Sequence, residues 1–369
     1  MIAALYGMIS EKYDLPPSGI VRALFHKAIT TKPQKSFPKE FLDTPHEYLK
    51  NDVSSLISIR KKQDVFRLRK KLITFLWGAQ AIPSSLPSQL NKDISDSRYT
   101  DIEALARIDQ ITIEMEYGIN SIAYHFIPRI PNNKVVIYHA GHDQDFYDGK
   151  SRITQLLDEG YSVVAFAMPL SGLNNQPTVF IPKIGLLKLI SHDNMKFLSP
   201  KNGHPLKYFI EPVVIALNYL KREYAYTSTS MIGFSAGGWT ATLAAAVDPR
   251  IDKSFPVAGS LPIYLRSNSP RDWDDYEQTV PELYKNVNYL EIYILGSYGP
   301  RRMELQVLNQ FDPCCFAGTK SDTYKKIVID RIRDLGMGKY DLFLDTSDSG
   351  HSISDVAMLK ILGELKNSN

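Results

Sequence analysis

Apolar runs of five to eight residues alternate with amphipathic stretches from about Ile108 to the end of the chain. The run 134–139 (KVVIYH) and the run 161–168 are apolar at consecutive positions, which is typical of strands buried on both faces of a parallel sheet. Residues 206–223 are instead apolar at helical spacing. This alternation predicts an α/β fold, in which helices flank a mostly parallel, twisted sheet.

The same pattern gives the expected elements one by one. An antiparallel hairpin is expected at the start of the sheet, from residues 111–117 and 119–128, with its turn near Gly118. Later strands are expected at residues 134–139, 161–168, 228–233, 253–258, 303–309 and 340–345, and helices at 151–160, 206–223 and 236–247.

The first 107 residues differ from the rest, with helical periodicity and clusters of lysine and arginine. We predict an N-terminal helical extension or cap at 1–107 and an α/β domain at 108–369. The basic run 60–71 is interpreted as the solvated face of a helix, with Val65, Phe66 and Leu68 packing on the other side.

Composition and charge limit the classes of partner. The net charge of +3 is too small to indicate nucleic acid as a partner. No stretch is long and apolar enough to predict a transmembrane segment. The apolar start, residues 1–9, lacks a basic leader and is expected to be helical, so a cytoplasmic location is predicted. The oligomeric state stays open.

A nucleophile is indicated by Gly233-Phe234-Ser235-Ala236-Gly237, which lies between an apolar strand and a helix of small residues. In the G-x-S-x-G elbow, the serine occupies a sharp strand-to-helix turn and its neighbours must lack bulk. The amide groups at the start of the helix then favour negative charge near the hydroxyl. The alternative is a glycine-rich helix start with a capping serine.

The base and the acid follow from chain order, which is serine, acid, histidine in hydrolases with this elbow. Of the 8 histidines, His351 alone follows Ser235, and it lies just after an expected strand. Asp312 follows the expected strand 303–309 and is the preferred acid, although Asp-Pro also starts ordinary turns. Asp345 and Asp348 are rivals, but they lie close to His351 along the chain.

The loop after residues 134–139 is expected to supply one amide of an oxyanion hole, at Gly141 or His142. The residue after the nucleophile, Ala236, would supply the other amide.

A metal centre is the alternative use of this loop. His139, His142, Asp143 and Asp145 form a dense group of potential ligands. Their spacing does not match an H-x-H-x-D-H arrangement, and no second group follows downstream. We therefore predict no metal.

The cysteines, Cys314 and Cys315, are adjacent and follow directly after the candidate acid. They cannot link distant parts of the chain, so no disulfide framework is predicted. They are expected to pack as small apolar residues, or to form a disulfide with each other.

The HAGH loop, GFSAGG, FDP and SGH together resemble the α/β-hydrolase superfamily, from about residue 108 to the C-terminus. Within it, the chain is most similar to the acetyl-xylan esterase and dienelactone-hydrolase-like branch. The resemblance implies a serine esterase that forms an acyl-enzyme and needs no metal or organic cofactor. It also implies an ester of a small molecule or carbohydrate as the substrate, with residues 170–201 as a lid or pocket wall.

Two other functions are compatible with this fold. A prolyl-oligopeptidase-like peptidase would normally carry a propeller domain, and the first 107 residues show no blade repeats. A non-catalytic hydrolase-fold binding protein typically lacks one residue of the triad, whereas here all three positions are filled. The sequence therefore favours a carboxylic ester hydrolase.

Overall fold

The computed structural model describes residues 44–142, 144–266, 270–273 and 275–367. All of these belong to one unit of the chain, residues 40–369. The helix predicted for residues 1–9 lies outside the described residues.

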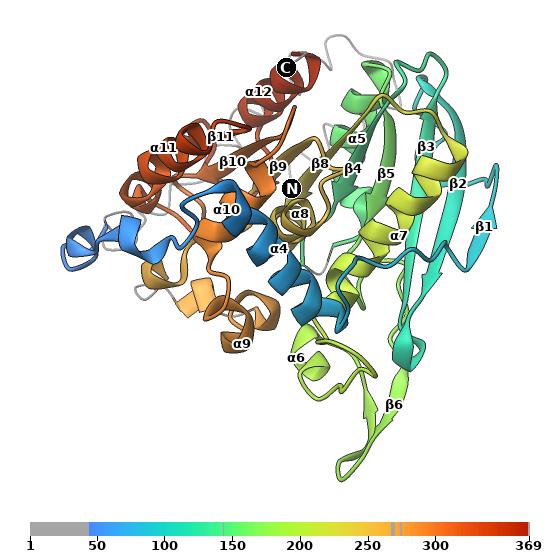
Figure 1. Cartoon of the computed structure of the whole chain (residues 1–369). Helices are drawn as coiled ribbons and strands as arrows, with labels where there is room; N and C mark the ends of the chain where they lie inside the picture. The colour runs from blue at the N-terminus through green and yellow to red at the C-terminus, as the bar shows by residue number, and fades with distance from the viewer. Residues whose placement is uncertain (1–43, 143, 267–269, 274, 368–369) are drawn as a thin grey trace, which may run out of the picture. The chain divides into compact units, whose positions relative to one another are not determined.

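A nine-stranded sheet forms the centre of this unit (Figure 1). Its strand order is β1-β2-β3-β5-β4-β8-β9-β10-β11. Pairing is antiparallel from β1 to β5 in this order and parallel from β5 to β11, so the predicted fold class is confirmed. The strands are β1 Gln89–Asn91, β2 Leu105–Glu114, β3 Asn120–Pro128, β4 Lys134–His139, β5 Ser162–Phe166, β8 Ser228–Phe234, β9 Lys253–Val257, β10 Met303–Asn309 and β11 Lys339–Asp345.

Both faces of the parallel part are covered by helices. Val135 and Ile137 of β4 belong to one apolar cluster, and Val136 and Tyr138 belong to the other, because successive side chains point to opposite faces. The first cluster includes residues of α4, α7, α8, α10 and α11; the second includes residues of α5 and α12. The helices are α4 Lys62–Trp77, α5 Lys150–Asp158, α7 Lys207–Glu223, α8 Ala236–Val247, α10 Tyr289–Ser297, α11 Lys325–Leu335 and α12 Asp355–Lys366.

Three elements have the bounds that were predicted: the strands 134–139 and 303–309 and the helix 236–247. The first long strand, β2, instead begins at Leu105, well before the predicted position. Asp109 in this strand is buried, and its carboxylate lies 2.9 Å from the Nε atom of Arg107. The buried carboxylate of Asp109 and its partly exposed partner Arg107 interrupt the apolar pattern from which the strand was predicted, which explains the late predicted start.

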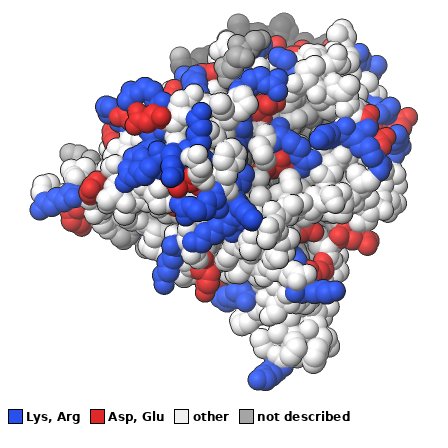
Figure 2. All heavy atoms as spheres, in the orientation of Figure 1, with Lys and Arg blue, Asp and Glu red and all other residues white. Residues whose placement is uncertain are grey.

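The basic run forms the first part of α4, and residues 44–107 pack within the same unit as the sheet. Figure 2 shows Lys and Arg side chains gathered over α4, with acidic side chains among them. Val65 and Leu68 are buried as expected. Phe66 is 60% exposed, so its predicted packing was wrong, and Arg69 takes the inward position instead.

Two buried arginines hold the C-terminal ends of α8 and α10. Arg69 donates from Nε to the carbonyl oxygen of Ala246 (2.9 Å) and from Nη2 to that of Leu295 (2.8 Å). Arg302 donates to the carbonyl oxygens of Ala245 (2.5 Å) and Leu295 (3.1 Å). Burial lowers the pKa of Arg302 to about 9. Cations at these positions satisfy the unpaired carbonyl groups and match the negative end of the helix dipole.

The predicted lid segment, residues 170–201, contains regular structure that the sequence did not indicate. Its parts are the hairpin β6 (Thr178–Ile181) and β7 (Gly185–Lys188) and the short helix α6 (His192–Met195). The hairpin projects from the rest of the unit (Figure 1). Phe180 and Leu186 on it are 67% and 78% exposed.

Among the described residues, no helix combines the length and the hydrophobicity that a bilayer span requires.

The buried side chain of His125 in β3 predicts a pH-dependent stability. Burial lowers the pKa of His125 from its ordinary value of 6.5 to about 4. Between these values the unfolded chain binds the proton and the folded chain does not, so stability falls as the pH is lowered from 6.5 to 4. The loss from this one group is about 3 kcal/mol across the window.

We expect His125→Gln to make the pH dependence of the unfolding free energy shallower between pH 6.5 and 4, as measured by urea denaturation at several pH values. Tyr226→Phe is the matched control, since it removes the hydroxyl 2.9 Å from Nε2 of His125 and leaves the titrating ring in place. An unchanged slope in His125→Gln would contradict this assignment.

Candidate active site

Ser235 lies between the end of β8 and the first residue of α8, in a strained backbone conformation. Its φ of 54° and ψ of −124° place a residue with a side chain in a region that only glycine enters readily. A methyl group on Gly233 would overlap the backbone of Gly237, and one on Gly237 would overlap the carbonyl groups of His139 and Ala140. Glycine is therefore required on both sides of Ser235.

Backbone hydrogen bonds hold the turn in this conformation. The Ser235 amide donates to the carbonyl oxygen of Val257 in β9 (2.8 Å). Its own carbonyl oxygen accepts from the amides of Gly238 (2.8 Å) and Trp239 (3.1 Å). The side chain of Ser235 is thereby fixed between the carboxyl end of the sheet and the start of α8.

His351 lies in the loop between β11 and α12, and the structure brings it to Ser235. Its Nε2 atom is 2.9 Å from the Ser235 Oγ atom. The imidazole packs on Phe234, with the ring centroids 4.7 Å apart. With its side chain 22% exposed, the ring faces the nucleophile while staying open to a substrate.

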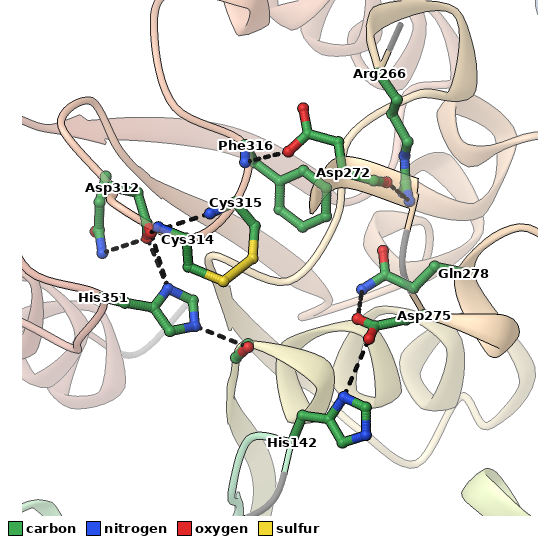
Figure 3. Close-up of a disulfide and its surroundings, with 12 residues drawn as sticks. His142, Arg266, Asp272, Asp275, Gln278, Asp312, Cys314, Cys315, Phe316 and His351 are labelled. Carbon is green, nitrogen blue, oxygen red and sulfur yellow. Dashed lines mark hydrogen bonds and ion pairs between the residues drawn. A yellow bond between two sulfur atoms is a disulfide. The ribbon is translucent and has the colours of Figure 1, made fainter. Parts of the chain in front are cut away.

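Asp312 follows β10 and lies on the other side of the same ring (Figure 3). Its Oδ1 and Oδ2 atoms are 3.0 Å and 2.9 Å from the Nδ1 atom of His351. Oδ1 also accepts from the backbone amides of Cys314 (2.8 Å) and Cys315 (3.2 Å). The carboxylate is fully buried and is oriented by these donors.

The rival acids have other partners. Asp345 accepts from the amide and hydroxyl of Ser347 and from the hydroxyl of Ser354. Asp348 accepts from the Gly350 amide (3.0 Å) and the Ser352 hydroxyl (2.6 Å). Both carboxylates thus shape the loop that carries His351, and neither contacts its ring in the described structure.

The loop after β4 lies against the nucleophile. A methyl group on Gly141 would be 3.0 Å from the Cβ atom of Ser235 and 3.0 Å from the Oε1 atom of Gln144. The Gly141 amide donates to this Oε1 atom (3.2 Å). Ala236 is the first residue of α8, where amides have no partner within the helix. Of the three residues expected around an oxyanion, Gly141 therefore lies against the Ser235 turn and Ala236 follows it directly in the chain, while His142 is the residue after Gly141.

Among the described residues of the same loop, His139, His142 and Asp145 each have a different partner. His139 is buried, its Nδ1 atom donates to the carbonyl oxygen of Ala140 (3.0 Å), and burial lowers its pKa to about 4. His142 pairs with Asp275 (3.0 Å) and Asp145 with Arg98 (3.0 Å). Asp143 lies outside the described residues.

Two histidine–carboxylate pairs, His142–Asp275 and His192–Glu277, lie next to each other beside this loop. The rings of His142 and His192 stack with their centroids 4.4 Å apart, and His192 pairs with the buried Glu277 (3.2 Å). Figure 3 shows His142 facing Asp275. Burial raises the pKa of Asp275, but the hydrogen bond and charge of His142 outweigh it and bring the pKa below its ordinary value.

Large aromatic side chains differ in whether a substrate could reach them. Tyr208, Phe209 and Trp239 are fully buried and belong to the core. Trp273 is 44% exposed and lines an apolar cavity of about 400 Å³ together with Tyr264.

Sequence reasoning missed several residues of this region. Gln144, His192 and Glu277 carry no motif, and Glu277 is 85 residues from its partner His192. The only available signal was the position of Gln144 three residues after Gly141 in the loop.

Comparison of the sequence with protein-family models and with curated proteins gives no match. Solved structures do match the fold. The acetyl xylan esterase 1 of Thermoanaerobacterium sp. is 14% identical, with a TM-score of 0.58 over 88% of this chain and 99% of that one. The acetyl xylan esterase of Paenibacillus sp. R4 is 16% identical, with a TM-score of 0.53 over 86% and 98%.

The glucuronoyl esterase of Solibacter usitatus is 13% identical, with a TM-score of 0.53 over 86% of this chain and 94% of that one. At these identities the similarity establishes the fold and leaves the substrate open. The antiparallel start of the sheet, the parallel strands from β5 to β11 and the Ser235 turn after β8 agree with that similarity. The chain therefore has the α/β-hydrolase fold.

Proposed function

We propose that this protein is a carboxylic ester hydrolase that works through an acyl-enzyme on Ser235. The observation that carries the proposal is the continuous hydrogen-bonded series from Asp312 through His351 to Ser235. Such a series, with the serine on a strained turn at a helix start, is the arrangement that activates a hydroxyl for acyl transfer.

In the first half of the reaction, the Ser235 Oγ atom attacks the ester carbonyl carbon and its proton passes to the Nε2 atom of His351. Asp312 fixes the ring through Nδ1 and stabilises the imidazolium that forms. The negative oxygen of the tetrahedral intermediate faces the amide of Ala236 and an amide at Gly141 or His142. The intermediate collapses as the alcohol leaves with the proton from Nε2.

In the second half, water attacks the acyl-enzyme and His351 takes its proton. Collapse of the second intermediate releases the acid and returns the proton to the Ser235 Oγ atom. In both halves of the reaction, the base and the hydrogen-bond donors to the oxyanion are groups of the chain. A Gly141 amide that stabilises the oxyanion must first release Gln144, whose Oε1 atom accepts its hydrogen bond here.

The substrate class is part of the proposal. The similar structures are named as acetyl xylan and glucuronoyl esterases, which act on carbohydrate esters by those names. We infer that an ester of a carbohydrate or another small molecule is the substrate of this chain. A cytoplasmic location and an N-terminal extension that ends near residue 107 also remain predictions.

Replacement of the nucleophile or the base tests the mechanism. We expect Ser235→Ala and His351→Ala each to lower kcat for an acetate ester by at least about 10³-fold, because either change removes the nucleophile–base pair. Intact-mass labelling with a fluorophosphonate should give one adduct on the wild type and none on these variants. Ser151→Ala, at an exposed serine of α5, is the matched control. An adduct that survives Ser235→Ala would rule out this nucleophile.

A separate pair of variants tests the acid. Asp312→Asn should lower kcat on the order of 10³–10⁴-fold, because the amide no longer accepts from Nδ1 as a carboxylate does. Asp348→Asn should lower it by less than about tenfold, since Asp348 only holds the loop. The measurement is steady-state kinetics with melting temperatures as a check on folding. The reverse order of effects would make Asp348 the acid.

A substrate series tests the inferred class. We expect kcat/KM to be higher for acetylated xylo-oligosaccharides than for esters of long fatty acids with the same leaving group. A preference for long acyl chains would leave the triad proposal intact and would reject the carbohydrate-ester proposal.

A further inference from the structure

Cys314 and Cys315 lie beside the proposed base, in the connection that follows β10. Their sulfur atoms are bonded to each other, and both side chains are partly exposed. Figure 3 shows the disulfide next to His351 and Asp312. The mechanism above uses the backbone amides of the pair and does not use the sulfur atoms.

Asp312, which precedes the two cysteines in the chain, links them to the proposed active site. Its two amides donate to the Oδ1 atom of Asp312, and the same oxygen lies 3.0 Å from the Nδ1 atom of His351. These bonds are made by the backbone amides and not by the sulfur atoms. The cysteine side chains therefore stay close to His351 when the disulfide is opened.

The residues that follow the two cysteines in the chain are also held in place by hydrogen bonds. The Phe316 amide donates to the Oδ1 atom of Asp272 (2.8 Å), which is buried and pairs with Lys320 (3.4 Å). The Gly318 amide donates to the carbonyl oxygen of Gln310 (2.9 Å) and closes the loop. Both ends of the segment that carries the pair are thus held by contacts outside the disulfide.

The two sulfur atoms and one ring nitrogen of His351 all lie within 4.8 Å of one another. Two thiolates and an imidazole are a preferred ligand set for Zn²⁺. Ligand atoms on one tetrahedral Zn²⁺ are about 3.3–3.8 Å apart, given Zn–S and Zn–N distances of about 2.3 Å and 2.0 Å. On reduction the two sulfur atoms must move apart to this separation, and the ring nitrogen must approach them by at most about 1.5 Å.

We propose that the reduced pair Cys314–Cys315 binds one thiophilic divalent cation, such as Zn²⁺, with His351 as the third ligand, and that the bound cation switches the active site off. The effect on activity rests on the proposed esterase function, and the binding site itself does not.

The chemistry proceeds in two steps. A dithiol reductant transfers two electrons and two protons to the disulfide, which becomes two thiols while the reductant becomes its own cyclic disulfide. The two thiols then release two protons to solvent and bind Zn²⁺ as thiolates, and the imidazole donates a nitrogen lone pair. A ring that donates this lone pair to the metal no longer serves as the base for Ser235.

The test compares two samples of the full chain. One is oxidised; the other is reduced with a dithiol, which is then removed by anaerobic desalting. Zn²⁺ binding is measured by competition with a chromophoric chelator, and the active site by the rate of fluorophosphonate labelling. We expect one Zn²⁺ per reduced chain and none at this site in the oxidised chain. Saturating Zn²⁺ should slow labelling of the reduced chain at least about tenfold, and a strong chelator should restore it.

Variants separate this site from other zinc ligands. The double variant Cys314→Ser/Cys315→Ser should not bind Zn²⁺ at this site. Its rate of fluorophosphonate labelling should be the same with and without Zn²⁺. His351→Ala should weaken Zn²⁺ binding at least about tenfold through loss of a direct ligand. His46→Ala, at an exposed histidine outside the active site, is the matched control and should bind Zn²⁺ as the wild type does.

Failure of the site and failure of the esterase proposal give different results. A reduced wild type that binds no Zn²⁺, or a cysteine-pair variant that still binds one, overturns the zinc site. Binding of Zn²⁺ to the His351→Ala variant with unchanged affinity would also overturn the zinc site. Absence of labelling in zinc-free protein overturns the esterase proposal, while the chelator competition still tests the binding site.

Discussion

The strained backbone at Ser235 is the constraint on which the arrangement of the site depends. A residue with a side chain at φ 54° costs about 1–3 kcal/mol, so the surroundings must hold it there. The contact of Gly237 with the end of β4 and the bond from Ser235 to Val257 of β9 supply this support. The same close packing brings the Gly141 loop to the nucleophile, so one structural feature positions both the hydroxyl and the proposed oxyanion loop.

The two ends of α8 are used differently. Its C-terminal carbonyl groups accept from the buried Arg69 and Arg302, so that end is neutralised inside the protein. Its N-terminal amides adjoin Ser235, where negative charge develops in the proposed reaction. Because Arg69 belongs to α4, residues from the early part of the chain help to fix the helix that follows the nucleophile.

Much of this architecture could be predicted, because buried strands and the Ser235 elbow leave local patterns in the sequence. His351 followed from chain order. Asp312 was preferred over Asp345 and Asp348 from its position after a strand and its distance from His351 along the chain. The hydrogen bonds that give the three aspartates different partners are seen only in the three-dimensional structure.

The buried position of Arg69 and the His192–Glu277 pair were not predictable, since each depends on partners far away along the chain. The hairpin β6–β7 was missed because its exposed apolar residues do not follow the pattern of a buried strand.

The most direct test of the central claim is to trap the acyl-enzyme. Rapid acid quenching during turnover of an acetate ester, followed by peptide mass spectrometry, should find one acetyl group on the peptide that contains Ser235. If deacylation is slower than acylation, the acetylated peptide should appear in a burst before steady-state turnover. The amount of peptide formed in the burst should be proportional to the enzyme concentration. Hydrolysis of the ester with no acetylated peptide at any quench time, or with the acetyl group on another residue, would contradict the account.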